Sequence, residues 1–207
     1  MLAKGSYPWV ISTALCALIP VSLYIFTQST VFLYPSVFFI LLTLFFVVFF
    51  RDPVREVKVC KNCLLSPADG KVVDIRGNTI CIFMNIHNVH VNRAPFSGTI
   101  VSVEHKNGTF LPAFSKDSWR NERTEILMNT PMGNIMVTQI AGMLARRIVS
   151  YVKEGDEVIQ GQRIGMIRLG SRVDVKVPDV FEINRKLGDK VLAGQTRIAI
   201  TKDYSKE

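Results

Sequence analysis

The sequence predicts a mainly β protein, in which a compact sandwich-like or barrel-like domain follows a pair of apolar helices. Three observations lead to this prediction. No charged residue occurs at the 46 positions between Lys4 and Arg51. After Arg51, short apolar runs alternate with glycine, asparagine and proline turn signals, a spacing typical of all-β sandwiches and barrels. Two pairs of similar segments also repeat within that part of the chain.

The charge-free run divides into two apolar segments, at about residues 8–26 and 31–50, with a short polar stretch between them. A helix that spans a bilayer needs roughly 20 apolar residues, so each segment is long enough to cross. Lys4 precedes the pair, and Arg51 and Arg55 follow it. The positive-inside rule therefore predicts a membrane hairpin with both ends in the cytoplasm. A cleaved signal peptide or one long span with a re-entrant part are the alternatives.

Residues 51–207 are expected to form one domain on the cytoplasmic side of the cell membrane, because their number suits a single core. All 17 acidic residues and all but one of the 25 lysines and arginines lie there. Cys60 and Cys63 form a lone CxxC pair, which is half a zinc site, while Cys16 and Cys81 lie in apolar runs. We therefore expect no metal site and no disulfide, as suits a reducing compartment.

Alternation of apolar and polar residues, bounded by turn signals, marks the strands of this domain. A turn at Arg76-Gly77-Asn78 and another at Pro131-Met132-Gly133 separate neighbouring runs. A short helix is expected at residues 114–120. The expected strands lie at residues 70–75, 79–84, 98–103, 126–128 and 134–140.

Internal repetition is visible at two places. Residues 155–162 (GDEVIQGQ) recur as residues 188–195 (GDKVLAGQ), and residues 66–73 (SPADGKVV) resemble residues 94–101 (APFSGTIV). Glycine supplies a positive φ at a turn, aspartate bonds to its own backbone, and valine and isoleucine supply a buried face. The pattern is similar to the hammerhead hairpins of biotinyl and lipoyl domains. It also builds frames that hold no cofactor, so it indicates a fold and not a function.

Five residues could carry chemistry. His87 and His90 lie in a polar, asparagine-rich stretch, and a neutral imidazole is the usual proton-transfer group, although both could be packing residues. Asp69 precedes a glycine, as turn residues do, but an aspartate can also hold a histidine in one tautomer. Ser171 follows Gly170, and in a strained turn its hydroxyl can attack the preceding carbonyl once a histidine activates it.

Four of these residues, Asp69, His90, Gly170 and Ser171, belong to a longer series of segments that run in order from position 49 to position 174. With this series the chain resembles the phosphatidylserine decarboxylase proenzymes, in their short form with an N-terminal membrane hairpin, which includes archaetidylserine decarboxylase-like proteins. The segments are FFRDPVR (49–55), SPADGKV (66–72), NVHVNRAP (88–95), NER (121–123), QIAG (139–142), ARRI (145–148) and GMIRLGSRVD (165–174).

The resemblance implies a self-processing lyase. In that family the bond between Gly170 and Ser171 would break by serinolysis, to give a large chain (1–170) and a small chain (171–207). Ser171 would become a covalent pyruvoyl group, which forms a Schiff base with the substrate amine. The reaction would decarboxylate the serine head group of a phospholipid, from phosphatidylserine to phosphatidylethanolamine or between the archaeal ether-lipid equivalents.

The resemblance also implies roles for three side chains. Asp69 and His90 match a proteolytic triad with Ser171, in which His90 is the base and Asp69 orients it. His87 matches a second histidine of the family, associated with the head group or with decarboxylation. Larger members carry an aspartate where this chain has Asn85, which puts the role of that position in doubt.

The substrate is an anionic membrane lipid, so we expect basic side chains to bind it. Guanidinium groups pair with phosphate or carboxylate through two hydrogen bonds, although each arginine could equally be a solvated surface charge. The expected partners are the phospholipid, the membrane and the protein's own two chains, and a homo-oligomer is left open. The candidate arginines are Arg146, Arg147, Arg168 and Arg172.

Two other classes of protein share some of these sequence features. A membrane-tethered hammerhead module that binds or carries a group fits the repeats, but a carrier needs a modified lysine at a hairpin tip, and Lys71 and Lys190 only approach such a setting. A nucleic-acid-binding protein would fit the net charge of +8, but no basic and aromatic interleaving supports it, so no nucleic acid is expected. An intact mass distinguishes a cleaved enzyme from an uncut carrier.

Overall fold

The computed structural model describes the chain apart from residues 110, 113–118, 143–146, 169 and 204–207. The chain divides into two compact units, Met1–Pro53 and Val54–Glu207. The first contains α1 (Tyr7–Thr27), the short 3-10 helix η1 (Thr30–Phe32) and α2 (Leu33–Phe49). The second is built from strands. The prediction of a mainly β protein with two N-terminal apolar helices is therefore confirmed.

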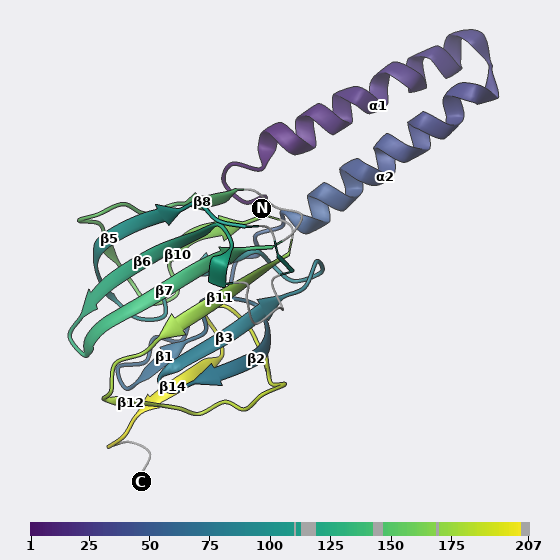
Figure 1. Ribbon diagram of the computed structural model, residues 1–207. Helices are drawn as coiled ribbons and strands as arrows, with labels where there is room; N and C mark the ends of the chain where they lie inside the picture. Colours follow the sequence, from purple (N-terminus) through teal and green to yellow (C-terminus); the bar gives the residue numbers. More distant parts are fainter. Residues whose placement is uncertain (110, 113–118, 143–146, 169, 204–207) are drawn as a thin grey trace. The chain divides into compact units, whose positions relative to one another are not determined.

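In the first unit, α1 and α2 pack against each other along their length (Figure 1). Trp9 of α1 meets Phe46 of α2 edge to face, with ring centroids 5.9 Å apart. The opposite sides of both helices present large apolar side chains, such as Phe26 and Leu41, which are 85% and 60% exposed. Both helices are long and apolar enough to cross a bilayer, and such an exposed surface suggests association with a membrane.

The second unit is dominated by one large sheet (Figure 1). Its strand order is β13-β2-β3-β11-β7-β6-β5-β9, and every neighbouring pair is antiparallel. Isoleucine and valine alternate along the central strands, so one face of the sheet is buried. The strands are β2 (Gly70–Arg76), β3 (Thr79–Met84), β5 (Gly98–Lys106), β6 (Arg123–Thr130), β7 (Gly133–Ala141), β9 (Glu157–Val158), β11 (Ser171–Lys176) and β13 (Lys190–Val191).

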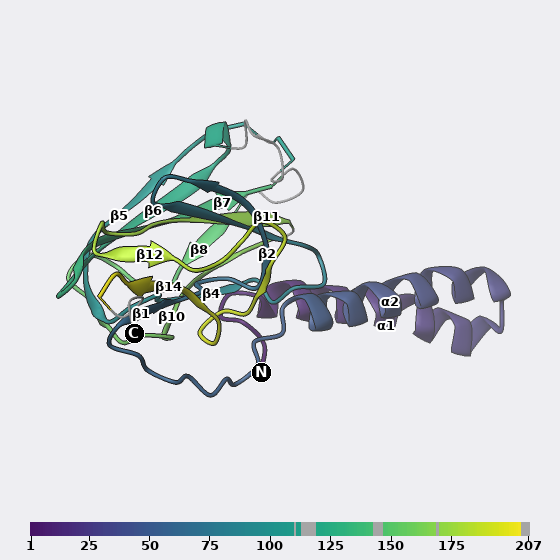
Figure 2. The same cartoon turned by 90° about the horizontal axis from the view of Figure 1, so that it is seen from below.

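Two small sheets lie beneath the curl of the large one (Figure 2). Ile82, Val137 and Val173 project from the large sheet into the shared core, where each is fully buried. The strands of the small sheets are β4 (Val91–Arg93), β8 (Ile148–Ser150) and β10 (Arg163–Ile167) in one, and β1 (Cys63–Leu65), β12 (Phe181–Ile183) and β14 (Arg197–Thr201) in the other.

The internal repeats occupy equivalent places in the sheet. One copy (188–195) contains β13 and the other (155–162) contains β9, and these two strands form the opposite edges of the large sheet. Each copy therefore contributes the same hairpin-like contact, whereas the likeness to hammerhead hairpins stays a prediction. The pairing agrees position by position: Gly70 with Val191 and Lys71 with Lys190 in one copy, and Gly98 with Val158 and Thr99 with Glu157 in the other.

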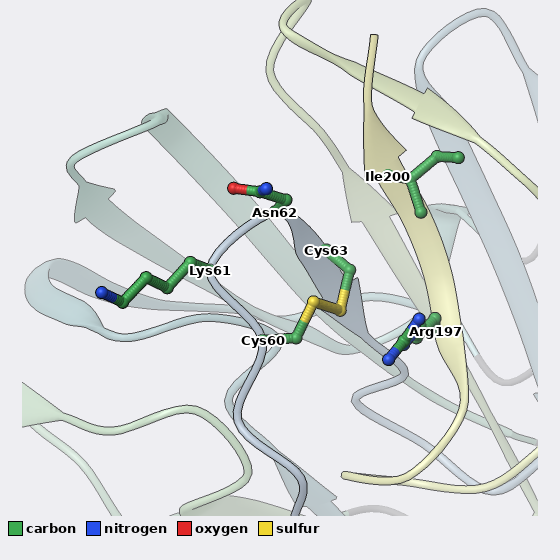
Figure 3. Close-up of a pocket in the computed structure, with 6 residues that line it drawn as sticks. All are labelled: Cys60, Lys61, Asn62, Cys63, Arg197 and Ile200. Carbon is green, nitrogen blue, oxygen red and sulfur yellow. A yellow bond between two sulfur atoms is a disulfide. The ribbon is translucent and has the colours of Figure 1, made fainter. Parts of the chain in front are cut away.

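The cysteines and residues 114–120 differ from the other expectations in their outcome. The prediction that the cysteines form no disulfide is wrong, because Cys60 and Cys63 are bonded to each other (Figure 3). The side chain of Gln160 closes this turn, since it accepts a hydrogen bond from Cys60 N–H at 2.7 Å and donates one to the Cys63 carbonyl at 2.9 Å. Sequence spacing could not reveal this distant partner. The helix expected at residues 114–120 falls largely outside the described residues.

Candidate functional site

Ser171 is the first residue of β11, a central strand between β3 and β7. It lies opposite Met84 on one side and Ala141 on the other, and it is fully buried. Gly170 precedes it with φ of +77°, a left-handed conformation that glycine adopts at little cost. The dipeptide therefore sits where a turn enters a fixed strand, and the serine hydroxyl faces the interior.

The hydroxyl of Ser171 belongs to a chain of buried polar contacts. Its Oγ lies 3.3 Å from Met84 Sδ, and Asn92 Nδ2 donates to the same sulfur at 3.7 Å. Gln139 Nε2 in turn donates to Asn92 Oδ1 at 2.7 Å. Burying an amide side chain costs free energy unless it is hydrogen-bonded. These paired amides therefore hold the surroundings of the Ser171 hydroxyl in place. Sequence reasoning missed Asn92 and Gln139, although both lie in the quoted motifs.

His90 lies just before β4, and its backbone carbonyl accepts a hydrogen bond from Ile167 N–H at 3.2 Å. His90 therefore lies beside Ile167, the last residue of β10. Ile167 precedes Gly170 by three residues. The ring is buried, with Nδ1 2.9 Å from the Asn88 carbonyl oxygen. Because a carbonyl can only accept, Nδ1 carries the hydrogen, and in the neutral ring Nε2 is the basic nitrogen.

Asp69 is held by groups other than those that the sequence suggested. Arg55 donates to both of its carboxylate oxygens, at 2.5 and 2.7 Å, and the Ala193 N–H donates at 2.8 Å. At the equivalent place of the other repeat copy, Ser97 Oγ accepts a hydrogen bond from Gln160 N–H at 2.9 Å. Asp69 therefore closes a turn, as Ser97 does. Unlike Ser97, it carries a negative charge, which pairs with Arg55. In the sequence, Arg55 stood out only as part of the FFRDPVR motif.

A pocket of about 410 Å³ contains His87, and this volume lies in the range of small-ligand sites. It opens next to the start of β11, because Asn85 of its lining directly follows Met84, the partner of Ser171. Asn88 lines the same pocket and also holds His90. The lining comprises residues 70–71, Phe83, Asn85, residues 87–88 and residues 190–192.

The candidate arginines differ in their surroundings. Arg172 is almost fully buried and donates to both oxygens of Asp174, at 2.6 and 2.7 Å. Burial, the largest single influence, opposes its charge, but the hydrogen bond and negative charge of Asp174 together with Cys81 outweigh burial and raise the pKa of Arg172. Burial, followed by the positive charge of Arg147, lowers the pKa of Arg168. Arg146 lies outside the described residues.

The buried serine after a left-handed glycine, the oriented histidine and the adjoining pocket can together support attack of a hydroxyl on its own backbone. Comparisons with known proteins identify a matching family. Residues 42–199 match the family model described as phosphatidylserine decarboxylase.

Similar proteins occur in archaea and bacteria. A protein of Methanococcoides burtonii, provisionally named archaetidylserine decarboxylase proenzyme, is 50% identical over 204 residues, which cover 99% of this chain and 98% of that protein. One of the same name from Methanosarcina barkeri is 52% identical over 98% of this chain and its own full length. A phosphatidylserine decarboxylase proenzyme of Streptomyces coelicolor is 46% identical, over 95% of this chain and 91% of that protein.

Proposed function

Because the chain belongs to the phosphatidylserine decarboxylase family, we propose that it is a carboxy-lyase that removes the carboxylate of a phospholipid's serine head group as CO2. An ethanolamine head group is the product. The relatives bear the names of both ester-lipid and ether-lipid enzymes, so the proposal covers both. Membership of this family does not favour the alternative of a hammerhead carrier module.

We propose that the active form arises by self-cleavage. The Ser171 hydroxyl attacks the Gly170 carbonyl, so the peptide C–N bond breaks and an ester forms. Elimination then releases Gly170 as a carboxylate and leaves dehydroalanine at position 171. Water hydrolyses this residue and ammonia leaves, so the small chain (171–207) begins with a pyruvoyl group and the large chain ends at Gly170. The left-handed Gly170 and the buried hydroxyl support this proposal.

His90 is the proposed base, since its Nε2 can take the hydroxyl proton while the Asn88 carbonyl keeps the ring in one tautomer. Asp69 is the proposed orienter of His90, and the structure supports an indirect route. Arg55 and the Ala193 N–H hold its carboxylate, and the Pro67 carbonyl of the same turn accepts a hydrogen bond from Arg93 N–H of β4, the strand that follows His90. His87, which lines the pocket beside the cleavage position, is proposed to contact the head group or to return a proton to its α-carbon.

The surroundings of Ser171 also suit a pyruvoyl group. The thioether of Met84 is an apolar, weakly accepting neighbour that tolerates a hydroxyl before processing and a methyl group after it. When present, the ketone of that group supplies the electron sink that decarboxylation of an amino acid needs. The residues of this chain bind and orient the head group and keep water away from it.

We further propose that the two helices anchor the enzyme and that the catalytic unit acts on the cytoplasmic side of the membrane. The apolar surface of the helices and the positions of Lys4 and Arg51 at their ends support this orientation.

Intact mass tests the central step. Wild-type protein should give two chains, divided between residues 170 and 171, whereas Ser171→Ala and His90→Ala should each remain one chain. Ser102→Ala, in the partly exposed part of β5, is the control and should be cleaved normally. A Ser171→Ala chain that is still cut at this bond, or a wild-type chain that stays whole while it releases CO2, would overturn the proposal.

A further inference from the structure

Two lysines face each other in the wall of the pocket that contains His87. Lys71 of β2 and Lys190 of β13 are direct partners in the antiparallel pair, and both line this pocket. Like charges opposite each other on neighbouring strands destabilise a sheet. Within the part of the chain that the structure describes, no carboxylate forms an ion pair with either lysine. The pocket wall therefore carries uncompensated positive charge.

The fold itself does not require this charge. In the other repeat copy, the residues equivalent to Lys71 and Lys190 are Thr99 and Glu157, which pair in the same register at the opposite edge of the sheet. The same strand pairing therefore tolerates a neutral residue opposite an acidic one. The difference between the copies is that only one adjoins His87 and the start of β11.

Protection of a sheet edge is another reason for a lysine on β13, because charged residues on edge strands prevent association between sheets. This reason applies to Lys190 but not to Lys71, since β2 is covered by β13 on one side and by β3 on the other. The Lys71 side chain also leans over the Gly188 turn, where an added Cβ would lie 3.7 Å from its Cε.

We infer that Lys71 and Lys190 bind the phosphodiester of the lipid head group while His87 faces its serine portion. This inference rests on the proposed function and names the anion-binding part of that site. The site pairs ammonium groups with a phosphodiester anion, and Asn85 and Asn88 supply neutral donors in the same pocket. Among the arginines that the sequence suggested, Arg172 already pairs with Asp174.

The test compares Lys71→Gln/Lys190→Gln with Lys153→Gln/Lys202→Gln, which removes the same charge at two exposed positions away from the pocket. Three quantities are measured in neutral detergent: the KM for short-chain phosphatidylserine, inhibition by glycerophosphoethanolamine, and inhibition by ethanolamine, which lacks the phosphate. The pocket variant should raise the first KM and the inhibition constant of glycerophosphoethanolamine by about tenfold or more, as expected for lost hydrogen bonds between charged groups.

The pocket variant should leave self-cleavage, kcat and inhibition by ethanolamine unchanged, and Lys71→Arg/Lys190→Arg should retain most of the binding. An unchanged KM, or equal weakening of both inhibitors, would overturn the inference. So would an effect seen only on vesicles with added anionic lipid, because that result indicates general attraction to a membrane. If instead the wild-type protein releases no CO2 from any serine phospholipid, the proposed function fails, which is a separate result.

Discussion

At the scale of single residues, Asp69 has two structural roles. Its carboxylate closes a turn that Ser97 closes in the other repeat copy, and it also neutralises Arg55. The side chains of this ion pair are only 9% and 5% exposed, so neither charge has ready access to water. A substitution at Asp69 therefore alters the fold as well as any contribution to the reaction at Ser171, and a simple loss of activity cannot separate the two.

We predict that Asp69→Asn lowers the free energy of unfolding by about 3–5 kcal/mol, because it leaves Arg55 as a buried charge without its counter-charge. The double variant Arg55→Met/Asp69→Asn should regain most of this loss. Guanidinium unfolding followed by circular dichroism measures the stability, and intact mass measures cleavage in the same samples. Cleavage that returns with stability in the double variant would contradict the role of Asp69 at His90.

At the scale of elements, β3 and β11 bring three groups together on one face of the sheet. Arg172 and Asp174 lie on β11, and Cys81 on β3 is the direct partner of Asp174. Burial, followed by the nearby charge of Asp174, raises the pKa of the Cys81 thiol to about 12 from its ordinary value of 9.0. The thiol is therefore protonated at every pH in which the protein would normally act.

This shift predicts a loss of stability between about pH 9 and pH 12. In that range the unfolded chain releases the thiol proton and the folded chain retains it, so rising pH favours unfolding. Lysine and tyrosine side chains also titrate there, so the measurement is the difference in unfolding free energy between wild type and Cys81→Ala at each pH. The difference should change across this range, and a constant difference would show that Cys81 is not buried as a thiol.

The local sequence pattern predicted the longer strands whose pairing partners include a neighbour in the sequence. The strand expected at residues 79–84 has those bounds in the structure, and β2 and β7 differ from expectation by one residue at their ends. Strands of three residues, such as β1 and β4, were missed because they are held by partners far away in the chain, β14 and β10.

The same limit applied to the site. Gly170, Ser171 and the histidines stand out as residue types, and their motifs indicate their chemistry. The contact between Asn92 and Gln139 arises only when β4 of a small sheet packs against β7 of the large one, so no spacing could reveal it. The pairing of Lys71 with Lys190 likewise depends on how the second repeat returns to the edge of the sheet.

At the scale of the whole molecule, the chain divides into two compact units, Met1–Pro53 and Val54–Glu207. Phe46 and Phe49 of the helical unit are buried, and Ile82 and Val173 belong to the core of the β unit. The disulfide and the Arg55–Asp69 pair both lie inside the second unit, so a chain that begins at Val54 keeps them. The catalytic residues proposed here all lie in that unit as well.

We therefore predict that residues 54–207 fold alone and cleave themselves, and that the full chain sediments with lipid vesicles whereas the shortened chain does not. Removing the helices deletes the apolar surface that favours a bilayer, and the contacts of Ser171 with Met84 and Ala141 lie within residues 54–207. On substrate dispersed in detergent, the shortened chain should retain kcat within about threefold, a change of less than 1 kcal/mol. Vesicle sedimentation, intact mass and CO2 release measure these properties. Sedimentation that persists would show that the helices are not the anchor, and an uncut shortened chain would show that self-cleavage needs them.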